Sequence, residues 1–260
     1  MMKNELQRLI DIVARLRAPG GCPWDREQTH ASILSCLLEE AYEFFEAVDE
    51  NDPHKMEEEL GDLLLQVVLH AQMGTDEKQF TIEDVARGIS EKLIRRHPHV
   101  FGSVEVSNTD EVLRNWEQIK RGEKGKEHRR YLVDDIPAEL PALLRAEKIQ
   151  KRVARVGFDW NDSGPALDKV EEEFGEFREA LAAGDRDNAV EEIGDIFFAL
   201  VNVARHEGIC AEEALRAANK KFSTRFRYVE DACKRAGMDI KKTTLDELDK
   251  FWEEGKKRIG

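Results

Sequence analysis

The amino-acid sequence predicts an all-α protein built as a tandem pair of helical-bundle domains. No stretch shows the sustained period-two alternation of a half-buried strand, and apolar residues recur at helical spacing. Five carboxylates in the segment 38–62 recur in the segment 171–195, each 133 positions further along the chain. The helical periodicity and this repeat together predict two similar domains, which suits a chain of 260 residues.

Five helices are predicted in the first half of the chain. Asn4 can cap the first, whose apolar residues keep helical spacing up to the Pro-Gly-Gly segment that follows. Pro53 suits the first turn of the third helix. Thr81 and Asp84 are placed to begin the fourth helix, which Pro98 ends. The expected helices span about 4–18, 31–49, 53–73, 81–97 and 110–120.

Five more helices are predicted in the second half. Pro137 and Pro141 flank the entry to the first of them, which runs to about residue 156. The last begins with Thr244 and Glu247 at the spacing of a capping box. The later four helices are expected at about 165–183, 186–206, 211–236 and 244–257.

A charged segment separates the two halves. Residues 121–135 contain few apolar side chains, two glycines and many charges, which is typical of a linker. The loops around Trp24 and Trp160 occupy matching places in the two halves, with the tryptophans 136 positions apart. The predicted organisation is an N-terminal domain at 1–120, a linker at 121–136 and a C-terminal domain at 137–260.

Composition and charge argue against several classes of function. The formal net charge of -14 disfavours sequence-independent binding to a nucleic-acid polymer, which needs a basic face. The longest apolar run, around 63–71, is too short to span a bilayer, and the amphipathic N-terminal segment is unlike a signal peptide. The four cysteines form no CxxC pair and no zinc spacing. We therefore expect a cytoplasmic protein without a membrane partner.

Acidic residues at helical spacing are the strongest functional signal in the sequence. Glu39, Glu40 and Glu43 lie on one expected helix, and Glu59 and Asp62 lie on the next. Residues three apart on a helix share a side, so each helix presents a pair of carboxylates. The short turn between the helices favours antiparallel packing of their apolar surfaces, which would bring the two pairs to the same level.

The second copy repeats this arrangement with five acids: Glu172, Glu173, Glu176, Glu192 and Asp195. Facing carboxylates repel one another unless they are protonated or bridged by cations. That number of oxygen ligands suits Mg²⁺ or Mn²⁺, with positions left for water and a substrate phosphate. Gly61 and Gly194 also recur inside the helices, which predicts a close approach of helices beside the acids.

Two cationic pairs follow the acidic pairs on the next expected helix. Lys92 and Arg96 are four residues apart in the first half, as are Lys221 and Arg225 in the second. Cations beside a metal site favour an anion with several charges, such as a polyphosphate. Ion pairs with the acids, or a plain helix surface, are equally compatible with the spacing.

Two tryptophan–lysine pairs recur as well. Trp116 with Lys120 matches Trp252 with Lys256, again four residues apart in each pair. Such a pair can stack on a base and hold a phosphate. Packing of the tryptophans in a core explains the spacing equally well.

Taken in order, these residues resemble the MazG nucleoside triphosphate pyrophosphohydrolases, in their long two-domain bacterial form. The pattern EExxE followed by ExxD on paired helices carries the resemblance. It is accompanied by CPWDREQTH, LEEAYE, EELGDLLLQVV, KLIRRHPHVFG, WEQIK, LPALLRAEKIQKRVARVGFDW and NKKFSTRF. The resemblance implies MazG-like helical domains, magnesium dependence, hydrolysis of NTPs and dNTPs to a monophosphate and pyrophosphate, and homodimers in which both subunits can complete a site.

The resemblance also implies roles for particular residues. The expected metal ligands are Glu173, Glu176, Glu192 and Asp195 in the second domain, with Glu40, Glu43, Glu59 and Asp62 as counterparts in the first. Lys221 and Arg225 would hold phosphates, and Lys92 and Arg96 are their counterparts in the first domain. Trp252 and Lys256 would close over the nucleotide. Asn219 matches the family's NxKFxxRF pattern.

The second domain is expected to be the main catalytic site. The first domain has Ser90 in place of Asn219, so its substrate pocket departs from the family's pattern. A water is expected to attack the α-phosphorus while pyrophosphate leaves in line. Glu172 or one of the expected ligands would orient or deprotonate this water. Glu172 is the preferred candidate because it adjoins the expected ligand Glu173 and repeats as Glu39, the corresponding candidate in the first domain.

Two other classes of function stay open on the residues alone. One is a non-catalytic helical interaction module whose acids are merely solvated. The other is a dinuclear carboxylate oxidase, which needs Glu-x-x-His pairs on two helices, whereas only Glu27 and His30 have that spacing. No residue predicts a contact with a base edge, so the preferred base and sugar are not predicted.

Overall fold

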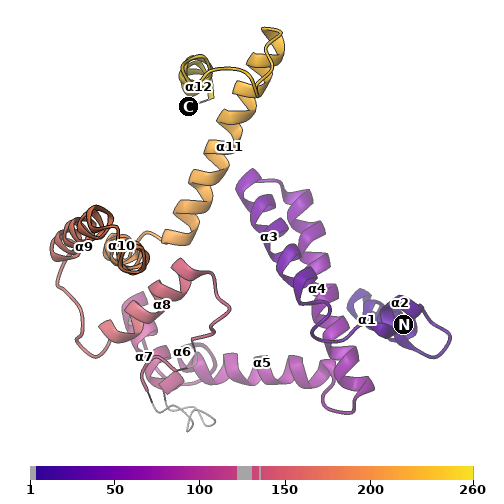
Figure 1. The fold of residues 1–260 in the computed structure, drawn as a ribbon. Helices are drawn as coiled ribbons and strands as arrows, with labels where there is room; N and C mark the ends of the chain where they lie inside the picture. Colours follow the sequence, from indigo (N-terminus) through magenta and orange to yellow (C-terminus); the bar gives the residue numbers. More distant parts are fainter. Residues whose placement is uncertain (1–3, 122–130, 135, 260) are drawn as a thin grey trace. The chain divides into compact units, whose positions relative to one another are not determined.

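The protein is helical throughout the residues that the structure describes, which are 4–121, 131–134 and 136–259 of a computed structural model (Figure 1). No strand occurs among them, which confirms the predicted all-α fold. The chain separates into two compact units, Met1–Lys124 and Gly125–Gly260. Most of the expected linker lies outside the described residues, so the domain limits 1–120, 121–136 and 137–260 stay a prediction.

The first unit contains seven helices among its described residues. They are α1 (Glu5–Arg17), α2 (Pro23–Glu27), α3 (Leu34–Glu50), α4 (Pro53–Asp76), α5 (Ile82–Arg96), α6 (Pro98–Phe101) and α7 (Thr109–Arg121). Five of them match expected helices. The short helices α2 and α6 were not expected, because four or five residues are too few to show a period.

The second unit contains the five expected helices. They are α8 (Ala142–Ala154), α9 (Gly164–Ala183), α10 (Arg186–His206), α11 (Ala211–Arg235) and α12 (Leu245–Ile259). One half of the expected capping box forms at the start of α12, since Thr244 donates its hydroxyl and its backbone N–H to the Glu247 carboxylate at 2.8 and 3.1 Å. None of the described helices is long and apolar enough to cross a membrane.

Two tight turns create the helical hairpins that matter for function, α3–α4 and α9–α10. Asn51 and Gly184 end α3 and α9 in the left-handed conformation, with φ of 52° and 69°. Asp52 and Asp185 follow at once, and their carboxylates accept backbone N–H groups in the first turn of α4 and α10. The same stop-and-cap sequence therefore folds each half into an antiparallel helix pair.

The core of the first unit lies where α1 and the start of α3 pack against α4. Its buried side chains are Val13, Ile33, Val68, Leu69 and Met73, with Leu9, Ile10, Leu65 and Ile82 packed against them. In the second unit the residues buried along α9 and α10 are mostly small, including Ala166, Ala180, Ala189 and Ala199. Small residues let the backbones of α9 and α10 lie close together.

Many large apolar side chains of the two hairpins remain exposed. Four matching positions are exposed in both hairpins: Leu34, Val48, Leu64 and Val67 in the first, and Leu167, Leu181, Phe197 and Leu200 in the second. Exposed apolar surface on this scale is typical of a surface that binds another protein. The duplicated positions indicate that both hairpins keep this property.

Candidate active site

The hairpin of α9 and α10 gathers three carboxylates of the second unit. Oxygen atoms of Glu173, Glu192 and Asp195 lie within 4.8 Å of one another. Glu173 lies on α9 and is only 6% exposed, whereas the other two lie one turn apart on α10. The structure thus brings together three of the four expected ligands of this unit. Glu176 lies outside this group of three.

The hairpin of α3 and α4 likewise gathers three carboxylates in the first unit. Oxygen atoms of Glu40, Glu43 and Glu59 lie within 4.8 Å of one another. Asp62 lies outside this group but close enough to raise the pKa of Glu40. The duplicated pattern therefore produces two acidic clusters of similar composition, each on its own antiparallel hairpin.

Crowding makes these carboxylates harder to ionise. Burial raises the pKa of Glu192 above its usual value, and the charges of Glu176, Glu173 and Asp195 raise it further. Burial, followed by the charge of Asp62, raises the pKa of Glu40 in the same way. Both clusters are arranged so that a divalent cation would relieve repulsion, and oxygen ligands of this kind suit a hard cation.

The two clusters also differ in a neighbouring lysine. Lys169, one turn before Glu173 on α9, places its Nζ 2.6 Å from Glu173 and 2.8 Å from Glu172. Hydrogen bonds to these two glutamates raise the pKa of Lys169 well above its usual range. Counting back 133 positions, the first unit has Cys36 in this place. Only the second cluster therefore has this lysine beside it.

The candidate general bases lie beside the clusters. Glu172 pairs with Lys169, and its side chain is 57% exposed. Glu39 is also exposed, on α3. Neither belongs to the three carboxylates that converge in its unit. Their role as general bases stays a prediction.

The predicted phosphate-binding and nucleotide-binding residues lie on α5, α11 and α12. The Arg96 guanidinium lies 5.1 Å from the centre of the Trp116 ring, which joins α5 to α7. Trp252 packs on Phe222 with ring centres 5.0 Å apart, which joins α12 to α11. Both tryptophans thus have packing partners in their own unit, as the packing alternative requires.

The other predicted phosphate-binding and nucleotide-binding residues whose side chains are described are exposed, half-buried or paired with a neighbour on the same helix. Lys256 pairs with Glu253 at 2.7 Å, and the side chain of Lys120 lies outside the described residues. Lys92, Lys221 and Asn219 are exposed, and Arg225 is half-buried. Their phosphate-binding and nucleotide-binding roles stay predictions.

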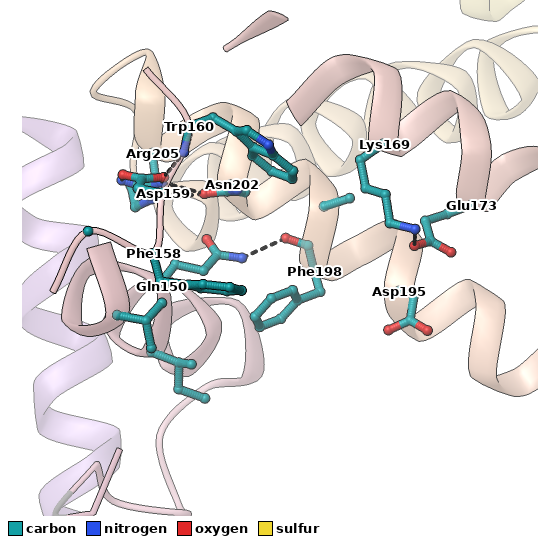
Figure 2. A pocket seen from close by; sticks show the side chains of 14 residues that line it. Gln150, Phe158, Asp159, Trp160, Lys169, Glu173, Asp195, Phe198, Asn202 and Arg205 are labelled. Carbon is teal, nitrogen blue, oxygen red and sulfur yellow. Dashed lines mark hydrogen bonds and ion pairs between the residues drawn. The ribbon is translucent and has the colours of Figure 1, made fainter. Parts of the chain in front are cut away.

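The acidic cluster of the second unit borders a pocket of about 640 Å³ (Figure 2). Its lining comes from α8, α9, α10 and the loop between α8 and α9. Lys169, Glu173 and Asp195 lie at one end, and Figure 2 shows Phe158, Trp160 and Gln150 toward the other. A pocket of this size, with a charged end and an aromatic end, suits an amphipathic small molecule.

One sequence feature, the repeated tryptophan loop, corresponds to part of this pocket. The loop around Trp160 matches the loop around Trp24, but this repeat suggested no function. Gln150 gave no signal, because a polar residue within an amphipathic helix is ordinary. Its significance depends on burial, since it is only 5% exposed.

The family model and two similar relatives point to the same family. Residues 28–101 and 166–229 match the family model of the MazG nucleotide pyrophosphohydrolase domain. The chain is 47% identical over 258 residues to a nucleoside triphosphate pyrophosphohydrolase of Escherichia coli, covering 98% of both chains. It is 44% identical over 250 residues to the nucleoside triphosphate pyrophosphohydrolase/pyrophosphatase MazG of Thermotoga maritima, covering 96% of this chain and 95% of that one.

A third relative is longer. The uncharacterized protein YabN of Bacillus subtilis is 49% identical over 257 residues, which are 98% of this chain and 52% of that protein. The two segments matched by the family model contain the two acidic clusters. The predicted resemblance is confirmed, and the chain belongs to the MazG family.

Proposed function

We propose that this protein hydrolyses nucleoside triphosphates, with ribose or deoxyribose, at the α-phosphorus to a monophosphate and pyrophosphate. The observation that carries the proposal is the convergence of Glu173, Glu192 and Asp195 beside a pocket large enough for a nucleotide. Membership of a nucleotide pyrophosphohydrolase family supports this reaction class. Such an activity suits housecleaning or regulation of the nucleotide pool.

Magnesium fits the donor set of the second unit. Glu173, Glu176, Glu192 and Asp195 are the residues that would hold it, all through hard oxygen atoms. Burial, followed by the charges of the neighbouring carboxylates, raises the pKa of Glu192, and a divalent cation would relieve the repulsion among these charges. When bound, Mg²⁺ supplies charge neutralisation for the phosphoryl oxygens of the substrate. Mn²⁺ has similar ligand preferences and is the expected substitute.

The remaining steps fall to side chains around the cluster. Glu172 orients the attacking water and accepts its proton, while the ion pair with Lys169 holds this carboxylate close to the ligands. Lys221 and Arg225 hold the pyrophosphate as it leaves, and Trp252 with Lys256 closes over the nucleotide. Asn219 contributes to the same substrate-binding helix, α11.

We assign the main activity to the second unit. Lys169 adjoins its acidic cluster, where the first unit has Cys36. Asn219 has Ser90 as its counterpart in the first unit, with Lys92 and Arg96 for Lys221 and Arg225. The first unit therefore keeps a metal-binding cluster with a less complete set of substrate-binding residues.

We further propose that the protein is a cytoplasmic homodimer. The exposed apolar positions shared by the two hairpins would be covered by a second copy of the chain. Gly61 and Gly194 leave room for that copy, because a Cβ atom built at either would meet no described atom within 4 Å apart from its chain neighbours and the backbone of its own helix. No helix of the described residues approaches these glycines closely, so the predicted close approach does not occur within one unit, and approach by a helix of a second copy stays a prediction. The four cysteines are free thiols, as expected in a reducing cytoplasm.

Replacing Glu192 and Asp195 together by alanine removes two ligands from the second cluster. We expect pyrophosphate release to fall by about 1000-fold or more, or roughly 4 kcal/mol of transition-state stabilisation. The matched control is Glu59→Ala with Asp62→Ala, which removes the equivalent pair of the first unit and should retain most activity. A coupled pyrophosphate assay with magnesium measures both, and near-normal turnover in the first variant would contradict the site assignment.

Glu192→Gln should stabilise the fold when magnesium is removed and should lose this advantage when magnesium is present. The folded-state pKa of Glu192 is raised, so its charge destabilises the fold increasingly as pH rises through that pKa. In EDTA at pH 7.5, Glu192→Gln should therefore have a higher thermal midpoint than the wild type. With millimolar-range magnesium the wild type should gain more than the variant. Scanning calorimetry measures both, and a magnesium response unchanged by the substitution would argue against Glu192 as a ligand.

Placing a charge on the exposed apolar surface should separate the dimer. Sedimentation equilibrium of the wild type should give twice the chain mass of 29.8 kDa. Phe197→Asp, at a position 53% exposed, should shift the protein toward the monomer. Asp187→Asn, an exposed change on the same helix α10, should leave the dimer intact. A monomeric wild type, or a dimer indifferent to Phe197→Asp, would be inconsistent with this surface.

A further inference from the structure

The end of the pocket away from the carboxylates has an aromatic lining. Phe158 and Trp160 come from the loop between α8 and α9, and Phe198 comes from α10. Their rings are 79%, 42% and 43% exposed, although aromatic residues normally contribute to a core when one is available. Three exposed rings around one pocket provide flat apolar surface without a partner in the chain's described residues.

The aromatic loop is fixed to α10 by an ion pair. The Arg205 guanidinium donates to both carboxylate oxygens of Asp159, one of them at 2.9 Å. Arg205 also donates through Nε to Asn202 at 2.9 Å. The Arg205 charge lowers the pKa of Asp159 although partial burial opposes this. Since Asp159 stands between Phe158 and Trp160 in the sequence, this ion pair positions both rings.

Gln150 has an unsatisfied acceptor in this pocket. Its Nε2 donates to the backbone carbonyl of Phe198 at 2.8 Å. A carbonyl can only accept, so this bond fixes which end of the amide carries the oxygen. The Oε1 atom is buried, and no donor among the described residues reaches it. Figure 2 shows the amide within the pocket, beside the Phe158 ring.

A buried acceptor without a donor is costly, so its presence needs an explanation. Leaving such a group unpaired costs about 1–3 kcal/mol. Because Gln150 is only 5% exposed, bulk solvent gives it little relief. A ligand that offers an N–H group to this oxygen, and flat faces to the surrounding rings, would satisfy both features at once.

We propose that this end of the pocket is the nucleobase subsite, in which Gln150 Oε1 accepts a hydrogen bond from an N–H group on the base edge. This inference rests on the proposed function, because the same pocket ends at the carboxylates that would hold the triphosphate. Trp160 and Phe158 contact the faces of the base. Gln150 is thus a specificity-determining residue, and Asp159 and Arg205 are positioning residues.

The first test needs no variant. For whichever natural nucleotide is hydrolysed best, it compares kcat/KM with that of an analogue lacking the N–H donor. The pairs are ATP with purine riboside triphosphate, CTP with 2-pyrimidinone riboside triphosphate, and UTP with N3-methyluridine triphosphate. Leaving Gln150 unpaired should reduce kcat/KM by about 5-fold to 150-fold. Equal turnover of donor-bearing and donor-lacking nucleotides in every pair would overturn the proposal.

The second test replaces the acceptor. Gln150→Met keeps the length of the side chain and removes the amide, so the preference for the donor-bearing nucleotide should shrink to about 3-fold or less. Lys148→Met, at an exposed position of the same helix α8, should retain the wild-type preference. Trp160→Leu should weaken binding of α,β-methylene nucleotides by about 10-fold or more for every base, without changing their order.

The outcomes separate this proposal from the proposed function. If the wild type releases no pyrophosphate from any nucleotide, the proposed function fails. If the wild type is active but Gln150→Met retains the full preference, the base subsite lies elsewhere and the inference fails alone. The wild-type analogue pairs decide the matter even if Gln150→Met does not fold.

Discussion

Repulsion among carboxylates held on an antiparallel helix pair is the constraint on which the rest of this structure depends. The turn between α9 and α10 sets their register, so that Glu173 on one helix faces Glu192 and Asp195 on the other. Bringing these charges within 4.8 Å opposes folding, and burial together with the neighbouring carboxylates raises the pKa of Glu192. On the proposed function, a bound cation would relieve this repulsion and would link folding, metal binding and catalysis in one hairpin.

Duplication supplied this hairpin twice, and the copies have since diverged around it. Lys169 pairs with two glutamates of the second copy, where the first has Cys36. The second acidic cluster also forms one end of a pocket whose other end is aromatic. A nucleotide with its phosphates at the carboxylates would place its base among these rings. We therefore propose that both copies bind metal and that the second carries out most of the catalysis.

The sequence predicted those parts of the structure that follow from local rules. Periodicity and caps located ten of the helices to within a few residues, and three-residue spacing predicted that the acids would converge. It missed α2 and α6, which are too short to show a period. It did not predict that Gly61 and Gly194 face open space within their own unit, because the surroundings of a helix cannot be inferred from the helix itself. Gln150 escaped notice because its importance comes from tertiary burial of one amide oxygen.

The site of water attack tests the central claim most directly. Hydrolysis of a nucleoside triphosphate in ¹⁸O-enriched water with magnesium, followed by mass spectrometry of both products, identifies the phosphorus that is attacked. Attack at the α-phosphorus, held beside Glu173, Glu192 and Asp195, predicts one labelled oxygen in the monophosphate and none in the pyrophosphate. Label in pyrophosphate, or release of a diphosphate with labelled inorganic phosphate, would contradict the account.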